Sequence, residues 1–204
     1  MITTVYLMRH SITEKVNYLN DNDSLLVRNQ KQILTIEGEE LAKKVSNNEI
    51  FSDIDMVISS NYVRAMATAK YFVKNNKLNI VEDFGEREFG IDDYKDIPPD
   101  FYERQLEEDD YKIGQGESQK EVRERMSKAL LEVVNNNEGK TILIVSHHTA
   151  IIFLLKKWCS ISDNKCLLYK DKVILEDGCR NCETVKLLFK DGELIEIENM
   201  EVCE

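Results

Sequence analysis

The sequence predicts a three-layer α/β/α fold with a mostly parallel central sheet. Two apolar runs of strand length, 2–8 and 141–146, lead to histidines, and segments with helical periodicity lie between the expected strands. Strands that alternate with helices favour a parallel sheet covered on both faces, which binds ligands beyond the carboxyl ends of its strands. Two further runs, 184–189 and 193–198, predict a C-terminal hairpin that adds an antiparallel edge.

The first part of the chain is expected to supply three strands and two helices. Residues 2–8 are apolar and β-branched, as in a buried strand, whereas the polar stretch 14–32 has no periodic pattern and is predicted to be a loop. Thr35 can cap a helix that has acidic residues in its first turn. The elements expected next are a strand at 55–60, a helix at 61–75 and a strand at 78–81.

The middle of the chain is expected to be irregular. Residues 82–117 are rich in acidic and aromatic residues and contain Pro98 and Pro99, which predicts a lid-like excursion. One short helix is expected within it, near residues 101–107. The acidic run 107–110 would repel polyanionic substrates if it lined the entrance to a site.

The remaining elements return to a regular pattern. Ser118 and Glu121 match a capping box, which opens an amphipathic helix. The strand 141–146 follows and leads to a buried helix at 150–155. Because one core commonly serves about 100–200 residues, we expect residues 1–204 to form a single domain.

The composition limits the partners and the compartment. A net charge of −11 argues against a broad nucleic-acid surface, which needs clustered Lys and Arg. No apolar run approaches the roughly 18 residues of a membrane span, and the first residues lack the features of a signal peptide. Five cysteines are an odd set that suits a reducing compartment. We therefore expect a cytoplasmic protein that binds neither nucleic acid nor membranes; its oligomeric state stays open.

Arginines and histidines gather where the predicted strands end. Arg9 and His10 follow the first strand, His147 follows the strand 141–146, and Arg64 lies in the first turn of its helix. Phosphoryl transfer through a covalent intermediate needs a nucleophile, cations for the phosphate oxygens and an acid for the leaving oxygen. A neutral imidazole can be the nucleophile, and a guanidinium can hold two phosphate oxygens. This set indicates a phosphate site.

Five blocks of sequence occur in a fixed order: Leu7–Thr13, Leu34–Ala42, Ser59–Ala69, Gly116–Ser118 and Val145–His148. Together they resemble the histidine phosphatase superfamily, in the branch that includes the cofactor-dependent phosphoglycerate mutases. Asn181-Cys182 and the hairpin resemble the closing strands of that family, so the resemblance covers nearly the whole chain. It implies an enzyme that needs no metal and no cofactor.

The resemblance assigns roles to particular residues. His10 would be the phosphorylated side chain, and Arg9, Arg64 and His147 would complete the phosphate pocket. The proton donor of the family corresponds to Glu86, in the segment Phe84–Gly90. Glu88 in the same segment is the alternative donor. A carboxylic acid that donates a proton near neutral pH needs an environment that favours its protonated form.

The chain departs from the family pattern at two positions. Ser11 and His148 stand where the family has glycine. The hydroxyl of Ser11 is a candidate phosphate ligand, as is that of Thr13. The candidates for contacts with the rest of the substrate are Arg28, Arg87 and His148.

Three functions compete on these grounds. The expected one is hydrolysis of a small-molecule phosphomonoester through a phosphohistidine. The mutase subgroup has a Trp-Asn pair and a basic insertion, whereas this chain has Lys15 and Val16 at the pair and an acidic insertion, so hydrolysis is favoured over phosphoglycerate mutase-type transfer. Ser11 and His148 motivate the third, a catalytically weak phosphate-binding or regulatory module.

The pair Cys179 and Cys182 has the spacing of half a zinc site. No second pair follows at a finger-like distance, and the region resembles the start of a strand. We therefore expect no metal there.

Overall fold

The computed structural model describes residues 1–14, 23–74, 77–162, 164–200 and 202. Its main sheet has six strands in the order β3-β2-β4-β1-β8-β9. Their bounds are β1 Ile2–Arg9, β2 Met56–Ser59, β3 Leu78–Ile80, β4 Thr141–Ser146, β8 Thr184–Lys190 and β9 Glu193–Met200. The first four strands run parallel, and the C-terminal hairpin β8–β9 forms the antiparallel edge. The fold predicted from the sequence is confirmed.

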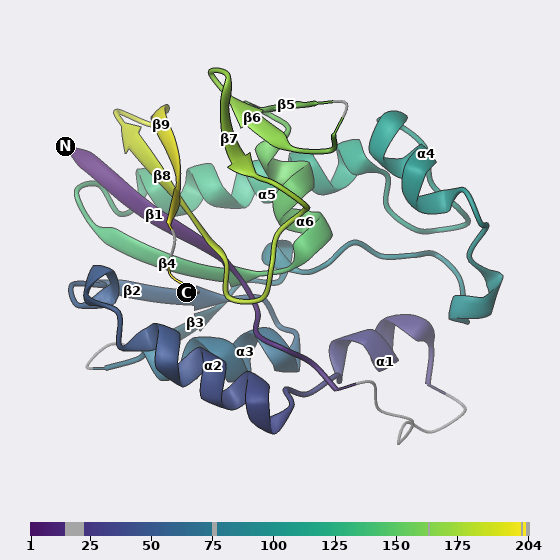
Figure 1. Cartoon of the computed structure of the whole chain (residues 1–204), viewed down its shortest axis with the longest axis horizontal. Helices are drawn as coiled ribbons and strands as arrows, with labels where there is room; N and C mark the ends of the chain where they lie inside the picture. The colour runs from purple at the N-terminus through teal and green to yellow at the C-terminus, as the bar shows by residue number, and fades with distance from the viewer. Residues whose placement is uncertain (15–22, 75–76, 163, 201, 203–204) are drawn as a thin grey trace.

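Helices cover both faces of this sheet. In Figure 1, α2 and α3 lie below the sheet, and α5 and α6 lie above it. The helices are α1 Leu25–Gln30, α2 Ile36–Ser46, α3 Val63–Ala69, α4 Phe101–Glu107, α5 Gln119–Asn135 and α6 His148–Leu155. Short 3-10 turns occupy Glu49–Phe51, Lys70–Phe72, Glu82–Phe84 and Tyr94–Asp96. Among the described residues, none of the helices has both the length and the apolarity that a membrane crossing requires.

The alternation of side chains along β1 and β4 divides the core into two layers. Val5 and Leu7 of β1 pack in the layer with α5 and α6, whereas Tyr6 and Met8 pack in the layer with α2 and α3. Strand β4 alternates in the same way, and its residues 142–145 are fully buried. Successive side chains of a strand point to opposite faces. The sequence of a central strand that is covered on both sides is therefore one continuous apolar run.

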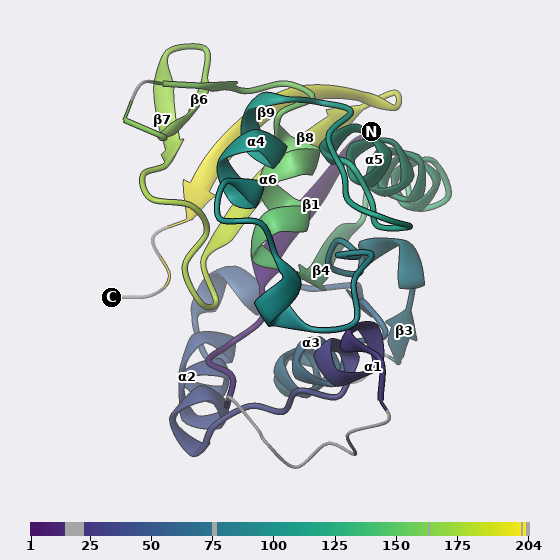
Figure 2. The same cartoon turned by 90° about the vertical axis from the view of Figure 1, so that its right-hand side faces the viewer.

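The register of the parallel strands brings distant segments to one edge. Arg9 of β1 lies opposite Ser146 of β4, and Val145 lies opposite Ser59 of β2. The residues that follow these strands therefore leave the sheet side by side. Figure 2 looks towards this end of the molecule, where α1 and α4 lie in front of the sheet.

Two predicted helix starts are confirmed in detail. The side chain of Thr35 accepts from the amide of Gly38 at the start of α2. Ser118 and Glu121 form the predicted capping box at the start of α5. Helix α4 also lies at the residues expected for it, within the irregular segment 82–117.

Other boundaries differ from the predictions. The loop predicted at 14–32 contains α1, because Ser24 caps the amide of Val27 and Leu25 finds a buried position. Residues 15–22 of that loop, including Lys15 and Val16, lie outside the described residues. The helix predicted at 61–75 is shorter: α3 ends at Ala69 and continues as a 3-10 turn, and residue 75 is outside the described ranges.

A small second sheet was not predicted. It contains β5 Ser160–Ile161, β6 Leu167–Tyr169 and β7 Lys172–Leu175, in that order. The turn between β6 and β7 is made by Lys170 and Asp171, both in the left-handed region with φ of 49° and 64°. Such turns usually show themselves through Asn-Gly or Asp-Gly, and here that signal is missing.

The capping box of α5 generates a prediction about stability. Replacement Ser118→Ala removes the acceptor for the amide of Glu121 and should lower the free energy of unfolding by about 1 kcal/mol. Urea denaturation measures this change. The matched control is Ser52→Ala at an exposed position, which should cost less than about 0.5 kcal/mol. Equal losses in both variants would contradict the role given to the cap.

Candidate active site

His10 lies at the point where β1 leaves the sheet. Its backbone amide donates to the carbonyl of Ser146 at 2.9 Å, which continues the β1–β4 ladder by one step. Its ring is almost completely buried, and Nδ1 lies 2.7 Å from the carbonyl oxygen of Ser11. Because a carbonyl can only accept, this contact places the proton of the neutral ring on Nδ1. The lone pair is therefore on Nε2.

Arg64 contacts that lone pair directly. Its Nε donates to Nε2 of His10 at 3.0 Å, and its Nη1 donates to the backbone carbonyl of Asn29 in α1. The side chain is only 3% exposed, and the guanidinium carbon lies 4.7 Å from the ring centroid of Tyr62. A guanidinium held between two elements is an oriented donor for an anion that reaches His10.

His147 lies beside His10 at the end of β4. The two ring centroids are 5.2 Å apart, and Nε2 of His147 is 2.7 Å from the hydroxyl oxygen of Ser60. That oxygen accepts from the amide of Tyr62 at 3.3 Å, so its own proton is available to Nε2. The ring proton of His147 then sits on Nδ1, a buried atom with no hydrogen-bond partner among the described residues. The Nδ1–H group of His147 is thus a donor that a ligand could use.

Arg9 adds a second guanidinium to the cluster. Its Nη1 donates to the carbonyl of Cys179 at 2.7 Å. Its Nε is buried and finds no partner within the described part of the chain. The positive charges of Arg9 and Arg64 act on both His10 and His147. The four residues expected from the sequence to surround one anion are therefore gathered at one edge of the sheet.

Burial and charge keep both imidazoles neutral. Burial is the main cause that lowers the pKa of His10 far below its usual value, and the charge of Arg64 acts in the same direction. Burial followed by Arg64 lowers the pKa of His147 in the same way. Two neutral rings between two guanidinium groups suit a tetrahedral dianion.

Glu86 is held at the start of α6, close to His147. Its carboxylate accepts from the amide of Arg87 at 2.9 Å, from that of Ala150 at 3.0 Å and from that of Thr149 at 3.2 Å. Glu88, the alternative proton donor, is exposed. The arrangement favours Glu86, because its side chain is anchored directly behind the second histidine.

The structure gives the hydroxyl of Ser11 a partner other than a phosphate. It donates to the carbonyl of Gly38 at 2.7 Å, and the amide of Ser11 donates to the hydroxyl of Thr68. Gly38 allows this approach of α2, since a Cβ there would meet the carbonyl oxygen of Ile12 at 2.2 Å. Thr13 makes an isolated backbone bridge with Leu34. The phosphate roles of Ser11 and Thr13 thus gain no support from these contacts.

Two of the three candidates for substrate contacts share a cavity. Arg87 and His148 line a cavity of about 520 Å³, together with Tyr102 of α4 and Ile152 of α6. Arg87 is 3% exposed, donates to the hydroxyl of Thr149 and lies 4.4 Å from the ring centroid of Phe89. Arg28 is placed differently and donates to the backbone carbonyl of Asp92.

The acidic run 107–110 is largely paired with basic side chains. Glu108 bonds Arg104, Asp109 bonds Arg123 and Asp110 bonds Lys120. The pairs of Asp109 and Asp110 connect the residues after α4 to α5, whereas the pair of Glu108 lies within the end of α4. The run therefore has a structural use, and its charge is partly neutralised.

Sequence reasoning missed three residues that orient the cluster. Ser60 fixes His147, Tyr62 packs against both His147 and Arg64, and the carbonyl of Asn29 holds Arg64. Ser60 and Tyr62 belong to the block 59–69, so their position beside Arg64 was a usable signal. Asn29 acts through its backbone, and a backbone contact leaves no signature in the residue type.

Comparison with known proteins identifies a family for this chain. The model of the histidine phosphatase superfamily (branch 1) matches residues 5–192. No curated protein matches the chain.

Similar folds occur among solved structures. A phosphoserine phosphatase from Entamoeba histolytica, solved as a mutant with phosphoserine, is 22% identical with a TM-score of 0.71, and the match covers 98% of each chain. A mycobacterial glucosyl-3-phosphoglycerate phosphatase is 16% identical with a TM-score of 0.72, over 98% of this chain and 97% of the other. YhfR from Bacillus stearothermophilus is 21% identical with a TM-score of 0.71, over 99% and 100%.

The lowered pKa values of the two histidines generate a prediction about pH. Between its folded and unfolded pKa each ring is neutral when folded and protonated when unfolded, so the unfolded state binds more protons. Stability should be intact above about pH 6.5 and fall below it, by up to about 1.4 kcal/mol per pH unit for each histidine. Urea denaturation from pH 7 to 5 should show a shallower fall in His10→Asn than in the native chain. Identical slopes would contradict this account.

Proposed function

The chain belongs to branch 1 of the histidine phosphatase superfamily, and on that premise we propose that it hydrolyses a small phosphomonoester through a phosphohistidine on His10. The observation that carries the proposal is the hydrogen bond from Nδ1 of His10 to the carbonyl of Ser11, because it leaves Nε2 as a nucleophile. The guanidinium of Arg64 lies 3.0 Å from that atom and supplies positive charge where a phosphoryl group would sit.

The first step transfers the phosphoryl group to His10. The lone pair of Nε2 attacks phosphorus, the N–P bond forms and the bond to the leaving oxygen breaks. The phosphate oxygens accept from the N–H groups of Arg64, which turn away from Nε2 and free it for attack. Arg9 and the Nδ1–H of His147 donate to the same oxygens. The buried Nε of Arg9 and Nδ1 of His147 have no hydrogen-bond partner among the described residues, which supports this role.

The leaving oxygen needs a proton, and Glu86 provides it. Its carboxyl group is anchored beside His147 by the amides of Thr149 and Ala150. When the P–O bond breaks, the proton moves from Glu86 to the alcohol oxygen. The alcohol then departs without carrying a negative charge.

Water completes the cycle. Glu86, now a carboxylate, takes a proton from a water molecule as that molecule attacks phosphorus. The N–P bond breaks, and inorganic phosphate and neutral His10 result. Glu86 is returned to its acid form, so protons and charge balance over the two steps.

The substrate proposed is a small organic phosphate. The cavity lined by Arg87 and His148 adjoins the anchor of Glu86 through Thr149 and offers about 520 Å³ for the alcohol part. Phosphoserine and glucosyl-3-phosphoglycerate are the compounds that the names of two structural neighbours contain, and both are phosphomonoesters of small alcohols. Hydrolysis is preferred to mutase transfer because these neighbours are phosphatases. The proposed reaction uses only side chains of this protein and a water molecule.

Loss of the nucleophile should abolish turnover. His10→Ala should reduce hydrolysis of p-nitrophenyl phosphate by more than about 10⁴-fold, since the variant lacks the nitrogen that attacks phosphorus. Native enzyme denatured in alkaline detergent, which preserves an N–P bond, should carry label from a ³²P-phosphate ester, and the variant should not. Full activity in the folded variant would refute the proposal. Vanadate binding by the native chain without turnover of any phosphomonoester would instead favour a binding module, and phosphoglycerate interconversion would favour a mutase.

Removal of the proton donor should depend on the leaving group. Glu86→Gln should lower kcat/KM for an alkyl phosphate by about 10²-fold or more, because an alkoxide leaves poorly without a proton. The loss for p-nitrophenyl phosphate should be much smaller. Glu88→Gln is the matched control and should stay within about threefold of the native enzyme for both substrates. Selective loss in Glu88→Gln would transfer the role to Glu88.

A further inference from the structure

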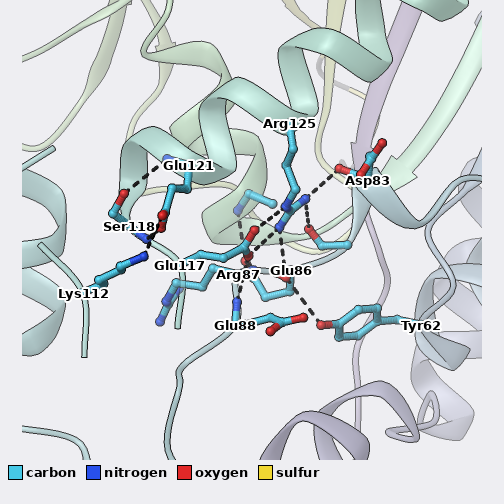
Figure 3. Close-up of polar contacts among 12 residues, drawn as sticks. Tyr62, Asp83, Glu86, Arg87, Glu88, Lys112, Glu117, Ser118, Glu121 and Arg125 are labelled. Atoms are coloured by element: carbon cyan, nitrogen blue, oxygen red, sulfur yellow. Dashed lines mark hydrogen bonds and ion pairs between the residues drawn. The ribbon is translucent and has the colours of Figure 1, made fainter. Parts of the chain in front are cut away.

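Arg125 of α5 is bound to the segment that carries Glu86. Its Nη1 donates to the backbone carbonyls of Asp83 at 2.7 Å and Gly85 at 3.2 Å, and its Nη2 donates to the carbonyl of Glu86 at 3.2 Å. Figure 3 shows the arginine reaching down from the helix to these carbonyls. One side chain therefore binds three backbone groups at or just before Glu86.

The same guanidinium is held by a carboxylate. Nε of Arg125 lies 2.6 Å from Oε1 of Glu117, and Nη2 lies 2.9 Å from Oε2. Both side chains are about four-fifths buried, with exposures of 21% and 20%. A paired, bidentate contact of this kind fixes the plane of the guanidinium and is less screened by solvent than an exposed pair.

Glu117 also reaches the other side of Glu86. Its Oε2 accepts from the backbone amide of Glu88 at 3.0 Å. The ion pair thus clamps the chain before Glu86 through Arg125 and after it through Glu117. Figure 3 shows the pair lying between the helix and this stretch of backbone.

The clamp matters because the backbone around Glu86 is irregular. The residues Glu82–Phe84 form a single 3-10 turn, and the chain then continues without a strand or helix up to residue 93. A segment without a regular ladder takes its position from side-chain contacts. Helix α5 is a firm support, since Val122 and Met126 on either side of Arg125 are fully buried.

We propose that Arg125, gripped by Glu117, is a positioning residue that holds Glu86 at the distance proton transfer requires. A general acid acts only within hydrogen-bond reach of the leaving oxygen, roughly 2.6–3.2 Å. The amides of Thr149 and Ala150 hold the carboxyl group itself, and Arg125 holds the backbone from which it extends. This inference rests on the proposed function.

The test measures a ratio of two activities in one sample. For each protein, kcat/KM is determined with p-nitrophenyl phosphate, whose leaving group needs no proton, and with β-glycerophosphate, whose leaving group does. The ratio of the first to the second does not change when part of a sample is unfolded. It responds to how well the acid works on the leaving group, so loss of folded protein alone would leave it constant.

In Arg125→Met the ratio should rise about tenfold or more, in the same direction as in Glu86→Gln, because the acid drifts from the leaving oxygen. Arg123→Met is the matched control, since Arg123 lies on the same helix and pairs with Asp109, away from Glu86. Its ratio should stay within about twofold of the native value. Glu117→Gln keeps the shape of the clamp, provides a second variant should Arg125→Met fail to fold, and should raise the ratio by a smaller factor.

The outcomes separate this inference from the proposed function. A native chain that hydrolyses neither substrate overturns both. If Glu86→Gln leaves the ratio unchanged, Glu86 is not the acid and the inference fails with it. If Glu86→Gln raises the ratio while Arg125→Met and Glu117→Gln do not, the phosphatase mechanism stands and the positioning role is overturned.

Discussion

The parallel pairing of β1 with β4 is the constraint on which the site depends. Their register places Arg9 opposite Ser146, so His10 and His147 leave the sheet at one level with ring centroids 5.2 Å apart. Strand β2 joins the other side of β4 and delivers Ser60 and Arg64 to the same edge. Parallel strands need long crossover connections, which are usually helical, and the three-layer fold follows from that requirement.

The site concentrates positive charge that the protein does not fully neutralise. Arg64 is almost completely buried, yet its partners are the ring of His10 and a backbone carbonyl. Arg9 likewise bonds a carbonyl and keeps one buried nitrogen without a partner among the described residues. Burial of guanidinium groups without a directly bonded carboxylate costs stability, and a bound dianion would restore it. The cluster is therefore better suited to a ligand-bound state than to the free protein.

Glu86 depends on two supports of different kinds. The first turn of α6 binds its carboxylate through backbone amides, and the ion pair of Glu117 and Arg125 on α5 binds its backbone. Both helices pack in the same layer of the core. The irregular segment with its carboxylate and the cluster on β1, β4 and α3 are thus held by elements that pack on the same sheet, although they lie far apart in the chain.

The sequence by itself determined the class of fold, the strands that carry the histidines, the capped helices α2 and α5, and the residues Arg9, His10, Arg64 and His147. Local periodicity and residue type predict those features. Tertiary structure alone decided which atom of His10 is free, that Ser11 turns to Gly38, and that Arg125 supports Glu86. It also revealed α1 and the sheet β5–β7, whose turn uses Lys170 and Asp171. These features depend on backbone carbonyls and amides brought together from distant segments. Every residue type except proline carries both groups, so no sequence pattern records them.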